Sequence, residues 1–268
     1  KENVLSRPDY LKILSEDHKI IGITGTHGKT STTALLSHIF HFNNLNVSYL
    51  YGGITTFNGI GGHYGDADKP LILETDEAFN TFEKINISDL LVLNVDSDHL
   101  DYFKNLDNYK TAFYKVMKNV TDNLVVNNDD LNIKSMKELK NLVSYGTDIS
   151  ADFKVQSSGI FIYENNKYEI KTDIIGDHFK SNMVGAIILA LLNGIEISDS
   201  LNAIESFAGV KRRIELIGIS KGVSIYDDYG HHPTEMEATI TALKEQTKSK
   251  LYVVFQPHRY TRTKEYFN

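Results

Sequence analysis

A glycine-rich turn followed by Lys-Thr constrains the fold of this chain more than any other feature of the sequence. A short β-branched segment at 19–24 leads into Gly25-Thr26-His27-Gly28-Lys29-Thr30, and apolar residues at helical spacing follow over 29–42. Another apolar segment at 47–50 completes the order strand, turn, helix, strand, which predicts a βαβ unit. Such a unit belongs to a parallel sheet whose two faces are covered by helices.

Strand and helix patterns keep alternating after this unit, as expected for an α/β fold. Between residues 152 and 172 shorter alternating segments with a turn at 164–167 indicate a small antiparallel insert. The other expected strands are 71–74, 90–95, 123–127 and 142–145, and the other expected helices are 106–120, 131–139, 180–193 and 198–208. We therefore predict a central domain built on a mostly parallel sheet, like that of P-loop ATPases.

The segment 208–213 has the composition of a hinge between two domains. After it the alternation restarts, with strands expected at 214–218, 223–226 and 251–255 and a helix at 233–244. We predict an ATP-binding central domain over 1–209 and a Rossmann-like α/β domain over 210–268. Three strands and one helix are too few to cover both faces of a parallel sheet, so we expect this second domain to be partial.

Charge and cysteine content exclude several classes of function. With 35 acidic and 28 basic side chains the net charge is -7, so no overall positive field attracts nucleic acid or an anionic membrane. The absence of cysteine excludes disulfides, thiolate catalysis and cysteine zinc sites. The apolar segments are too short to span a bilayer. We expect a soluble cytoplasmic protein that binds small anions through a local site, and the sequence does not indicate an oligomeric state.

The turn at 25–30 also predicts a site that binds phosphate groups. Glycines between a strand and a helix allow backbone N–H groups to converge on phosphate oxygens at the helix N-terminus. Lys29 would then neutralise the β- and γ-phosphates, and the Thr30 hydroxyl could bind Mg²⁺. Ser31 could contact phosphate or simply cap the helix. The alternative is an ordinary glycine turn, and Ile23 stands where the standard P-loop pattern has its first glycine.

Five segments together resemble the Mur ligase family. The turn reads Gly-Thr-His-Gly-Lys-Thr, the form found in that family in place of the standard P-loop. The other matching segments are 94–101 (NVDSDHLD), 209–213 (GVKRR), 227–234 (DDYGHHPT) and 255–263 (FQPHRYTRT). They occur in family order over nearly all of the chain and are most similar to the members that join L-alanine to UDP-N-acetylmuramate.

A second group of metal ligands is expected beside the loop. Glu74 ends one apolar strand and His99 follows the next, so in a parallel sheet both lie near the carboxyl edge, where ligands bind. A carboxylate and an imidazole suit a divalent ion that bridges two anionic substrates, and the resemblance implies that Glu74 and His99 bind a second Mg²⁺ besides the one at Thr30. Asp76, Glu77, Asp96, Asp98 and Asp101 add negative charge nearby and are not assigned as primary ligands.

The resemblance also implies contacts with the nucleotide. The loop residues Gly25, Thr26, His27, Gly28, Lys29, Thr30 and Ser31 would hold the phosphates. Asn182 would contact the adenine, although Phe179 replaces the first asparagine of the family motif and places one polar contact in doubt. Arg213 would contact the γ-phosphate, which suits a guanidinium group, and Asp228 would contact the ribose.

The amino-acid substrate would lie beside Tyr229 and His231, with His258, Arg259 and Arg262 following the last expected strand. Arg259 and Arg262 are three residues apart, so in a helical turn they share one side and could clamp one carboxylate. The resemblance implies the substrate roles of His231 and of the two arginines. A basic surface turn is the alternative for the arginine pair.

The function implied is an ATP-dependent ligation in peptidoglycan precursor synthesis. Lys29, His99 and Arg213 would act catalytically while UDP-N-acetylmuramate, L-alanine and ATP react through an acyl phosphate. The alternatives are the related ligase that recycles murein tripeptide, a folylpolyglutamate synthase, or a non-catalytic nucleotide-binding remnant. The segment 255–263 favours the alanine-adding members over the recycling ligase, and 227–234 argues against the synthase.

The family also has an N-terminal domain that holds the UDP group, whereas this chain begins about twenty residues before the ATP loop. We therefore expect the chain by itself to bind ATP weakly or not at all, and not to turn over UDP-N-acetylmuramate.

Overall fold

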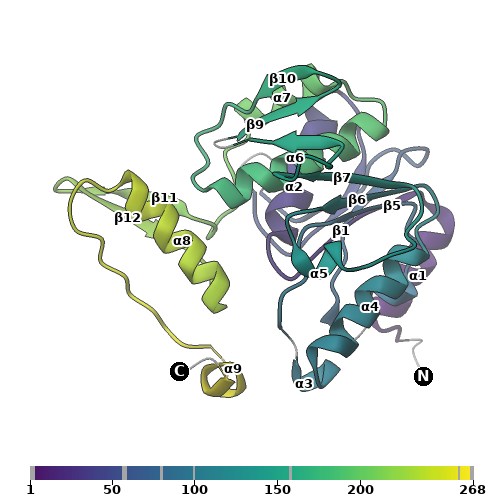
Figure 1. Ribbon diagram of the computed structural model, residues 1–268, viewed down its shortest axis with the longest axis horizontal. Helices are drawn as coiled ribbons and strands as arrows, with labels where there is room; N and C mark the ends of the chain where they lie inside the picture. The colour runs from purple at the N-terminus through teal and green to yellow at the C-terminus, as the bar shows by residue number, and fades with distance from the viewer. Residues whose placement is uncertain are drawn as a thin grey trace.

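The computed structural model describes residues 4–55, 59–78, 81–98, 100–156, 159–258 and 260–265 (Figure 1). Its helices are α1 (Arg7–Asp17), α2 (Lys29–Phe42), the short 3-10 helix η2 (Phe82–Lys84), α3 (Leu100–Phe103), α4 (Leu106–Lys118), α5 (Leu131–Lys134), α6 (Asp177–Leu192), α7 (Ile197–Glu205), α8 (Pro233–Gln246) and α9 (Tyr260–Glu265). Its strands are β1 (Ile20–Thr24), β2 (Ser48–Leu50), β3 (Gly62–His63), β4 (Leu71–Glu74), β5 (Asp89–Val92), β6 (Asn123–Asn127), β7 (Leu142–Gly146), β8 (Phe153–Val155), β9 (Ile160–Tyr163), β10 (Asn166–Glu169), β11 (Glu215–Ser220) and β12 (Val223–Asp227).

Ten strands form one sheet in the order β10-β9-β8-β7-β6-β5-β1-β4-β2-β3. The strands from β8 through β2 pair in parallel, and the antiparallel pairs lie at the two ends, with β9 and β10 at one and β3 at the other. In the register of β1 with β4, Ile23 is paired with Glu74. The loops that follow β1, β4 and β5 therefore leave the sheet at the same edge.

Two layers of apolar side chains hold helices against the two faces of this sheet. The five residues of β1 are all fully buried, and they alternate between the layers: Ile21 and Ile23 pack toward α2, α6 and α7, while Ile20 packs toward α1 and α4. Figure 1 shows the sheet between these two groups of helices. A strand buried on both faces reads as a continuous apolar run, as in parallel sheets generally. In the described part of the chain no helix is long and apolar enough to cross a bilayer.

The part of the described chain that follows the large sheet contains only a few elements. β11 and β12 form a separate two-stranded antiparallel hairpin, and α8 follows it (Figure 1). Arg212 and Ile214, which connect the hairpin to the first part, have positive φ angles of 59° and 48°. The chain therefore turns sharply within the segment that the sequence predicts to be a hinge.

The predicted α/β class, with its mostly parallel sheet and its antiparallel insert, is confirmed. The expected strand at 251–255 is wrong, because these residues have no strand partner and Val254 is 99% exposed. An apolar run becomes a strand only where a neighbouring edge accepts its backbone hydrogen bonds. The expected helix at 131–139 ends at Lys134, and Glu138 adopts a positive φ of 60° that helix continuation does not allow.

We predict that Phe113→Ala, in α4, lowers the free energy of unfolding by about 3–5 kcal/mol. Phe113 is fully buried and its ring packs against Phe82 at 5.2 Å between centroids, so truncation leaves a cavity that the core cannot fill. Phe42→Ala, at the end of α2 where the ring is 47% exposed, is the matched control and should cost about 1 kcal/mol or less. Equal losses in urea denaturation would contradict this account of the core.

Candidate functional site

The loop from Gly25 to Gly28 connects β1 to α2 at the carboxyl edge of the sheet. Gly28 has a left-handed φ of 85° and provides no side chain to cap the helix. The loop is held from the strand beside it, because Asn94 accepts the His27 N–H at 2.8 Å and its own amide donates to the His27 carbonyl at 3.0 Å. The backbone N–H groups in the first turn of α2 are thus directed to the space above the loop, where an anion is favoured.

Lys29 and Glu77 form a buried ion pair beneath this loop. The Lys29 Nζ donates to Glu77 Oε2 at 2.8 Å and to the Gly25 carbonyl at 2.6 Å, and Tyr109 donates to the other oxygen of Glu77 at 3.2 Å. Burial alone would lower the pKa of Lys29, yet the Glu77 and Asp76 carboxylates raise it above its usual value. Burial raises the pKa of Glu77, and Lys29 opposes that shift. Lys29 therefore stays protonated at the centre of the loop.

Thr30 and Glu74 meet on the other side of the loop. The Thr30 hydroxyl donates to Glu74 Oε1 at 3.0 Å, and Glu74 Oε2 accepts the Gly52 N–H at 2.7 Å. One hydroxyl and one carboxylate at a shared edge are oxygen ligands of the kind that Mg²⁺ prefers, so these two residues fit the ion that the sequence predicts. His99, the third predicted ligand, lies outside the described residues.

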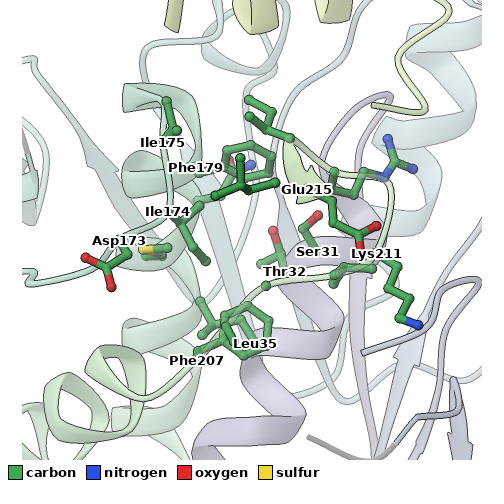
Figure 2. Close-up of a pocket in the computed structure, with 18 of the residues that line it drawn as sticks. Ser31, Thr32, Leu35, Asp173, Ile174, Ile175, Phe179, Phe207, Lys211 and Glu215 are labelled. Carbon is green, nitrogen blue, oxygen red and sulfur yellow. The ribbon is translucent and has the colours of Figure 1, made fainter. Parts of the chain in front are cut away.

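Two cavities open beside the N-terminal half of α2. One, of about 660 Å³, lies between α2, the segment 173–175 and the hinge, and Figure 2 shows Leu35, Ile174 and Phe207 on one side of it with Lys211 and Glu215 on another. The other, of about 490 Å³, lies between the loop from Gly25 to Gly28, here called the phosphate loop, and the start of α8. Both cavities are lined by Ser31, Phe179, Asn182 and Arg213.

Six of the predicted nucleotide contacts line these cavities: His27, Gly28, Ser31, Asn182, Arg213 and Asp228. Asn182 is buried and packs so closely on the loop that a Cβ on Gly28 would be 2.5 Å from its Nδ2 atom. Arg213 lines both cavities, and its guanidinium group lies 5.3 Å from the centre of the Tyr229 ring. Asp228 lines the smaller cavity, where its carboxylate accepts the N–H groups of Ile214 at 2.8 Å and Gly230 at 2.7 Å.

His27 connects the phosphate loop to α8. Its Nδ1 lies 3.1 Å from Glu235 Oε1 and its Nε2 lies 3.2 Å from Asp96 Oδ2. Burial works to lower the pKa of His27, but hydrogen bonds to Asp96 and Glu235 outweigh it and raise the pKa to about 9. The same contacts lower the pKa of Asp96, and they lower that of Glu235 against the effect of its burial. His27 is therefore a cation between two carboxylates at neutral pH.

The predicted amino-acid contacts form a separate group next to Arg213. The rings of Tyr229 and His231 lie 5.3 Å apart, and those of His231 and His258 lie 6.0 Å apart. Arg259 lies outside the described residues. The backbone of Arg262 belongs to α9, but its side chain is not among those that the structure describes.

Sequence reasoning missed the roles of Glu77, Asp96 and Glu235. Glu77 is almost fully buried, although the sequence offers no sign that separates it from the acidic residues around it. The bond between His27 and Glu235 joins residues 208 positions apart, a distance over which no periodicity operates. The Thr26 hydroxyl bonds to Tyr109 at 2.9 Å and to the Asp96 carbonyl at 3.1 Å, contacts that the sequence did not indicate.

Two family models match the chain. The model described as Mur ligase middle domain matches residues 23–190, and the one described as Mur ligase, glutamate ligase domain matches residues 212–267. Together they include the phosphate loop, the residues that line the smaller cavity and the hairpin with α8.

Relatives and solved structures with the same arrangement carry consistent names. The UDP-N-acetylmuramate--L-alanine ligase of Hydrogenobaculum sp. (strain Y04AAS1) is 38% identical over 275 residues, which cover 97% of this chain and 61% of that protein. The crystal structure of UDP-N-acetylmuramate-alanine ligase MurC from Thermotoga maritima superposes with a TM-score of 0.80 at 26% identity, over 95% of this chain and 61% of the other. A murein peptide ligase from Psychrobacter arcticus 273-4 has the same fold, with a TM-score of 0.70 at 23% identity over 90% of this chain and 58% of the other. The chain thus spans about three fifths of the length of the proteins it matches.

We predict that Gly28→Ala destabilises the protein more than Gly194→Ala does. The two glycines have nearly equal φ angles, 85° and 87°, so an alanine at either position costs about 1–2 kcal/mol of backbone strain. A Cβ on Gly194 meets nothing within 4 Å, whereas one on Gly28 collides with Asn182. Urea denaturation measures both losses, and equal values would show that the Asn182 contact does not restrict residue 28.

The His27 bridge should make stability depend on pH. The pKa of His27 in the folded protein, about 9, is higher than the unfolded value of about 6.5, so its contribution is complete below about pH 6.5 and disappears as the pH rises through about 9. We expect the stability difference between the wild type and His27→Gln to shrink over that range. The carboxylates have lowered pKa values, so their contribution is lost only at acid pH, below about 4.

His38→Gln is the control for this titration. Burial lowers the pKa of His38 in the folded protein, so its contribution is lost as the pH falls and not as it rises. Thermal unfolding from about pH 6 to about pH 10 compares the variants. A His27→Gln difference that stays constant over this range would contradict the charged bridge.

Proposed function

This chain belongs to the Mur ligase family, and on that premise we propose that it supplies the ATP-dependent core for joining L-alanine to the lactyl carboxylate of UDP-N-acetylmuramate. The product is an amide bond in a peptidoglycan precursor. The names of the relatives support the alanine-adding reaction, and the location proposed for it is the cytoplasm.

The observation that carries this proposal is the arrangement of charge around the phosphate loop. A protonated lysine lies at the centre of the loop, the amides of the first turn of α2 lie above it, and an oxygen pair for a metal lies beside it, from Thr30 and Glu74. A carboxylate and a triphosphate repel each other, so a ligase that activates one with the other must first neutralise both. Lys29 and the helix amides thus provide positive charge at one sheet edge, and a metal ion held by Thr30 and Glu74 would add to it.

Each group would have a separate task in the first step. The Lys29 ammonium and the amides of residues 28–31 would bind the phosphates of ATP, and the Arg213 guanidinium would hold the γ-phosphate from the hinge side. Asn182, which lies against the loop, would position the base, and Asp228 the ribose. Thr30, Glu74 and His99 would hold Mg²⁺, which when bound would neutralise phosphate charge.

Two bond exchanges complete the proposed reaction. An oxygen of the lactyl carboxylate attacks the γ-phosphorus of ATP, and the bond from that phosphorus to the β-phosphate oxygen breaks. The products of this step are ADP and an acyl phosphate. The amino group of L-alanine then attacks the acyl carbon, loses a proton and expels inorganic phosphate. Tyr229, His231 and His258, grouped next to Arg213, would orient the amino acid with Arg259 and Arg262.

A murein tripeptide recycling ligase is the second candidate, because a murein peptide ligase shares the fold. The sequence identity to that structure supports the fold alone. The named relatives with higher identity are L-alanine ligases. In the protein that carries this sequence, ADP release should require UDP-N-acetylmuramate and L-alanine together. ADP release that requires L-alanyl-γ-D-glutamyl-meso-diaminopimelate in place of L-alanine would assign the second function instead.

Two variants can separate the proposed binding of phosphate by Lys29 from the contribution of its ion pair with Glu77 to stability. Lys29→Met leaves the Glu77 carboxylate buried without its cation, which should cost about 3–5 kcal/mol of stability. Lys29→Met combined with Glu77→Gln removes both charges and should recover most of that loss. Both variants should bind a non-hydrolysable ATP analogue about 10- to 100-fold more weakly in the presence of Mg²⁺, because a charged hydrogen bond to phosphate is lost.

Calorimetric titration measures the affinities, and Lys84→Met, which removes an exposed lysine paired with Asp9, is the control. If the stable double variant binds the analogue as tightly as the wild type, Lys29 does not contact the phosphates and the proposed function loses its main support.

A further inference from the structure

Three side chains from separate parts of the chain converge beside the phosphate loop. His27 belongs to the loop itself, Asp96 follows β5, and His232 is the N-cap residue of α8. Asp96 Oδ2 lies 3.2 Å from His27 Nε2 and 4.0 Å from His232 Nδ1, and the two imidazole rings lie 4.8 Å apart. One ligand atom from each residue can be chosen so that all lie within 4.8 Å of one another.

These distances are close to those of a tetrahedral zinc site. Zn²⁺ binds imidazole nitrogen and carboxylate oxygen at about 2.0–2.2 Å, so its ligands lie roughly 3.3–3.5 Å from one another. The pair of His27 and Asp96 already has this spacing. His232 must move closer to bind the same ion, because its Nδ1 lies 4.0 Å from Asp96 Oδ2 and the three ligand atoms lie up to 4.8 Å apart.

The outer nitrogen of each histidine has a partner that would orient the ring for a metal. His27 Nδ1 lies 3.1 Å from Glu235 Oε1, and His232 Nε2 lies 3.0 Å from the Ser97 carbonyl. Each of these oxygens can accept an N–H from the ring. His27 Nε2, which is protonated at neutral pH, would release its proton to bind a metal ion. His232 Nδ1, which accepts the Thr234 N–H at 3.3 Å, would exchange that bond for the metal. Metal-binding histidines in proteins show the same pattern, with the second nitrogen bonded to a carboxylate or a backbone carbonyl.

Asp96 is held in a similar way. Its Oδ1 accepts the Ser97 N–H at 2.7 Å, and its Oδ2 accepts the Thr234 hydroxyl at 2.7 Å. His232 is 3% exposed, whereas the Asp96 side chain is 39% exposed. The group is therefore fixed within the protein and open to solvent on the Asp96 side, where an ion can enter and a water molecule can complete the coordination.

We propose that His27, Asp96 and His232 bind a divalent transition-metal ion of the Zn²⁺ class, at a site separate from the magnesium ligands Thr30 and Glu74. Two nitrogens and one oxygen favour Zn²⁺, Co²⁺ or Ni²⁺ over Mg²⁺, which prefers oxygen alone. The ion would join the phosphate loop, the end of β5 and the start of α8, and so hold α8 against the loop that binds nucleotide.

The experiment is a calorimetric titration of the metal-free protein with Zn²⁺ in excess Mg²⁺, repeated with Co²⁺ and followed by visible absorption. One equivalent of either ion should bind, and the Co²⁺ spectrum should report tetrahedral coordination. Asp96→Asn and His232→Asn should each weaken Zn²⁺ binding by more than about tenfold. Asparagine keeps a side-chain oxygen at position 232 and so preserves the cap of α8.

Two controls separate this site from its neighbours. Glu74→Gln alters the expected magnesium site, and His178→Gln removes a histidine that lines the same cavity without belonging to the group; both should bind Zn²⁺ as the wild type does. Glu235→Gln, which keeps its size but loses the charge that orients His27, should weaken Zn²⁺ binding about tenfold. No stoichiometric binding, or binding that Asp96→Asn leaves unchanged or Glu74→Gln removes, would overturn the proposal. None of these measurements depends on ATP turnover.

Discussion

The phosphate loop keeps its shape because a lysine and a glutamate neutralise each other beneath it. Burying either charge alone would cost several kcal/mol, so Lys29 and Glu77 must stay together wherever the chain is folded. Tyr109 bonds to Glu77 and also to Thr26, which extends the pair to α4 and back to the loop. The segment after β4, the loop after β1 and helix α4 are thus locked into one arrangement by a single charged centre.

The parallel register of the sheet is what places this centre at the site. β4 lies beside β1, and Ile23 pairs with Glu74, so the residues after both strands emerge at one edge. Glu74 then points to Thr30 while Glu77, three residues later, points to Lys29. Two adjacent residues at the start of α2 thus receive their partners from one short segment: Lys29 pairs with the Glu77 carboxylate, and the Thr30 hydroxyl donates to the Glu74 carboxylate.

The sequence was informative where the signal is local. The helix after the loop was expected over 29–42 and occupies Lys29–Phe42, because apolar spacing and the glycine turn fix both its phase and its start. The proximity of Glu74 to the loop also followed from strand order alone. The bonds from His27 to Glu235 and from Lys29 to Glu77 cross long stretches of chain, so only the folded structure shows them. The strand expected at 251–255 is wrong although its apolar pattern is typical of a strand, because these residues pair with no strand in the described part of the chain.

The direction of each loop side chain limits how the loop can hold a ligand. Thr26 is turned into the fold toward Tyr109, and His27 is turned toward Asp96 and Glu235, so neither hydroxyl nor imidazole faces the space above the helix. Gly25 and Gly28 have no side chains. On the proposed function, backbone N–H groups, Lys29, Thr30 and Ser31 would then hold the phosphates. The imidazole of His27 connects the loop with α8 through Glu235, and its two carboxylate partners hold its positive charge at the loop.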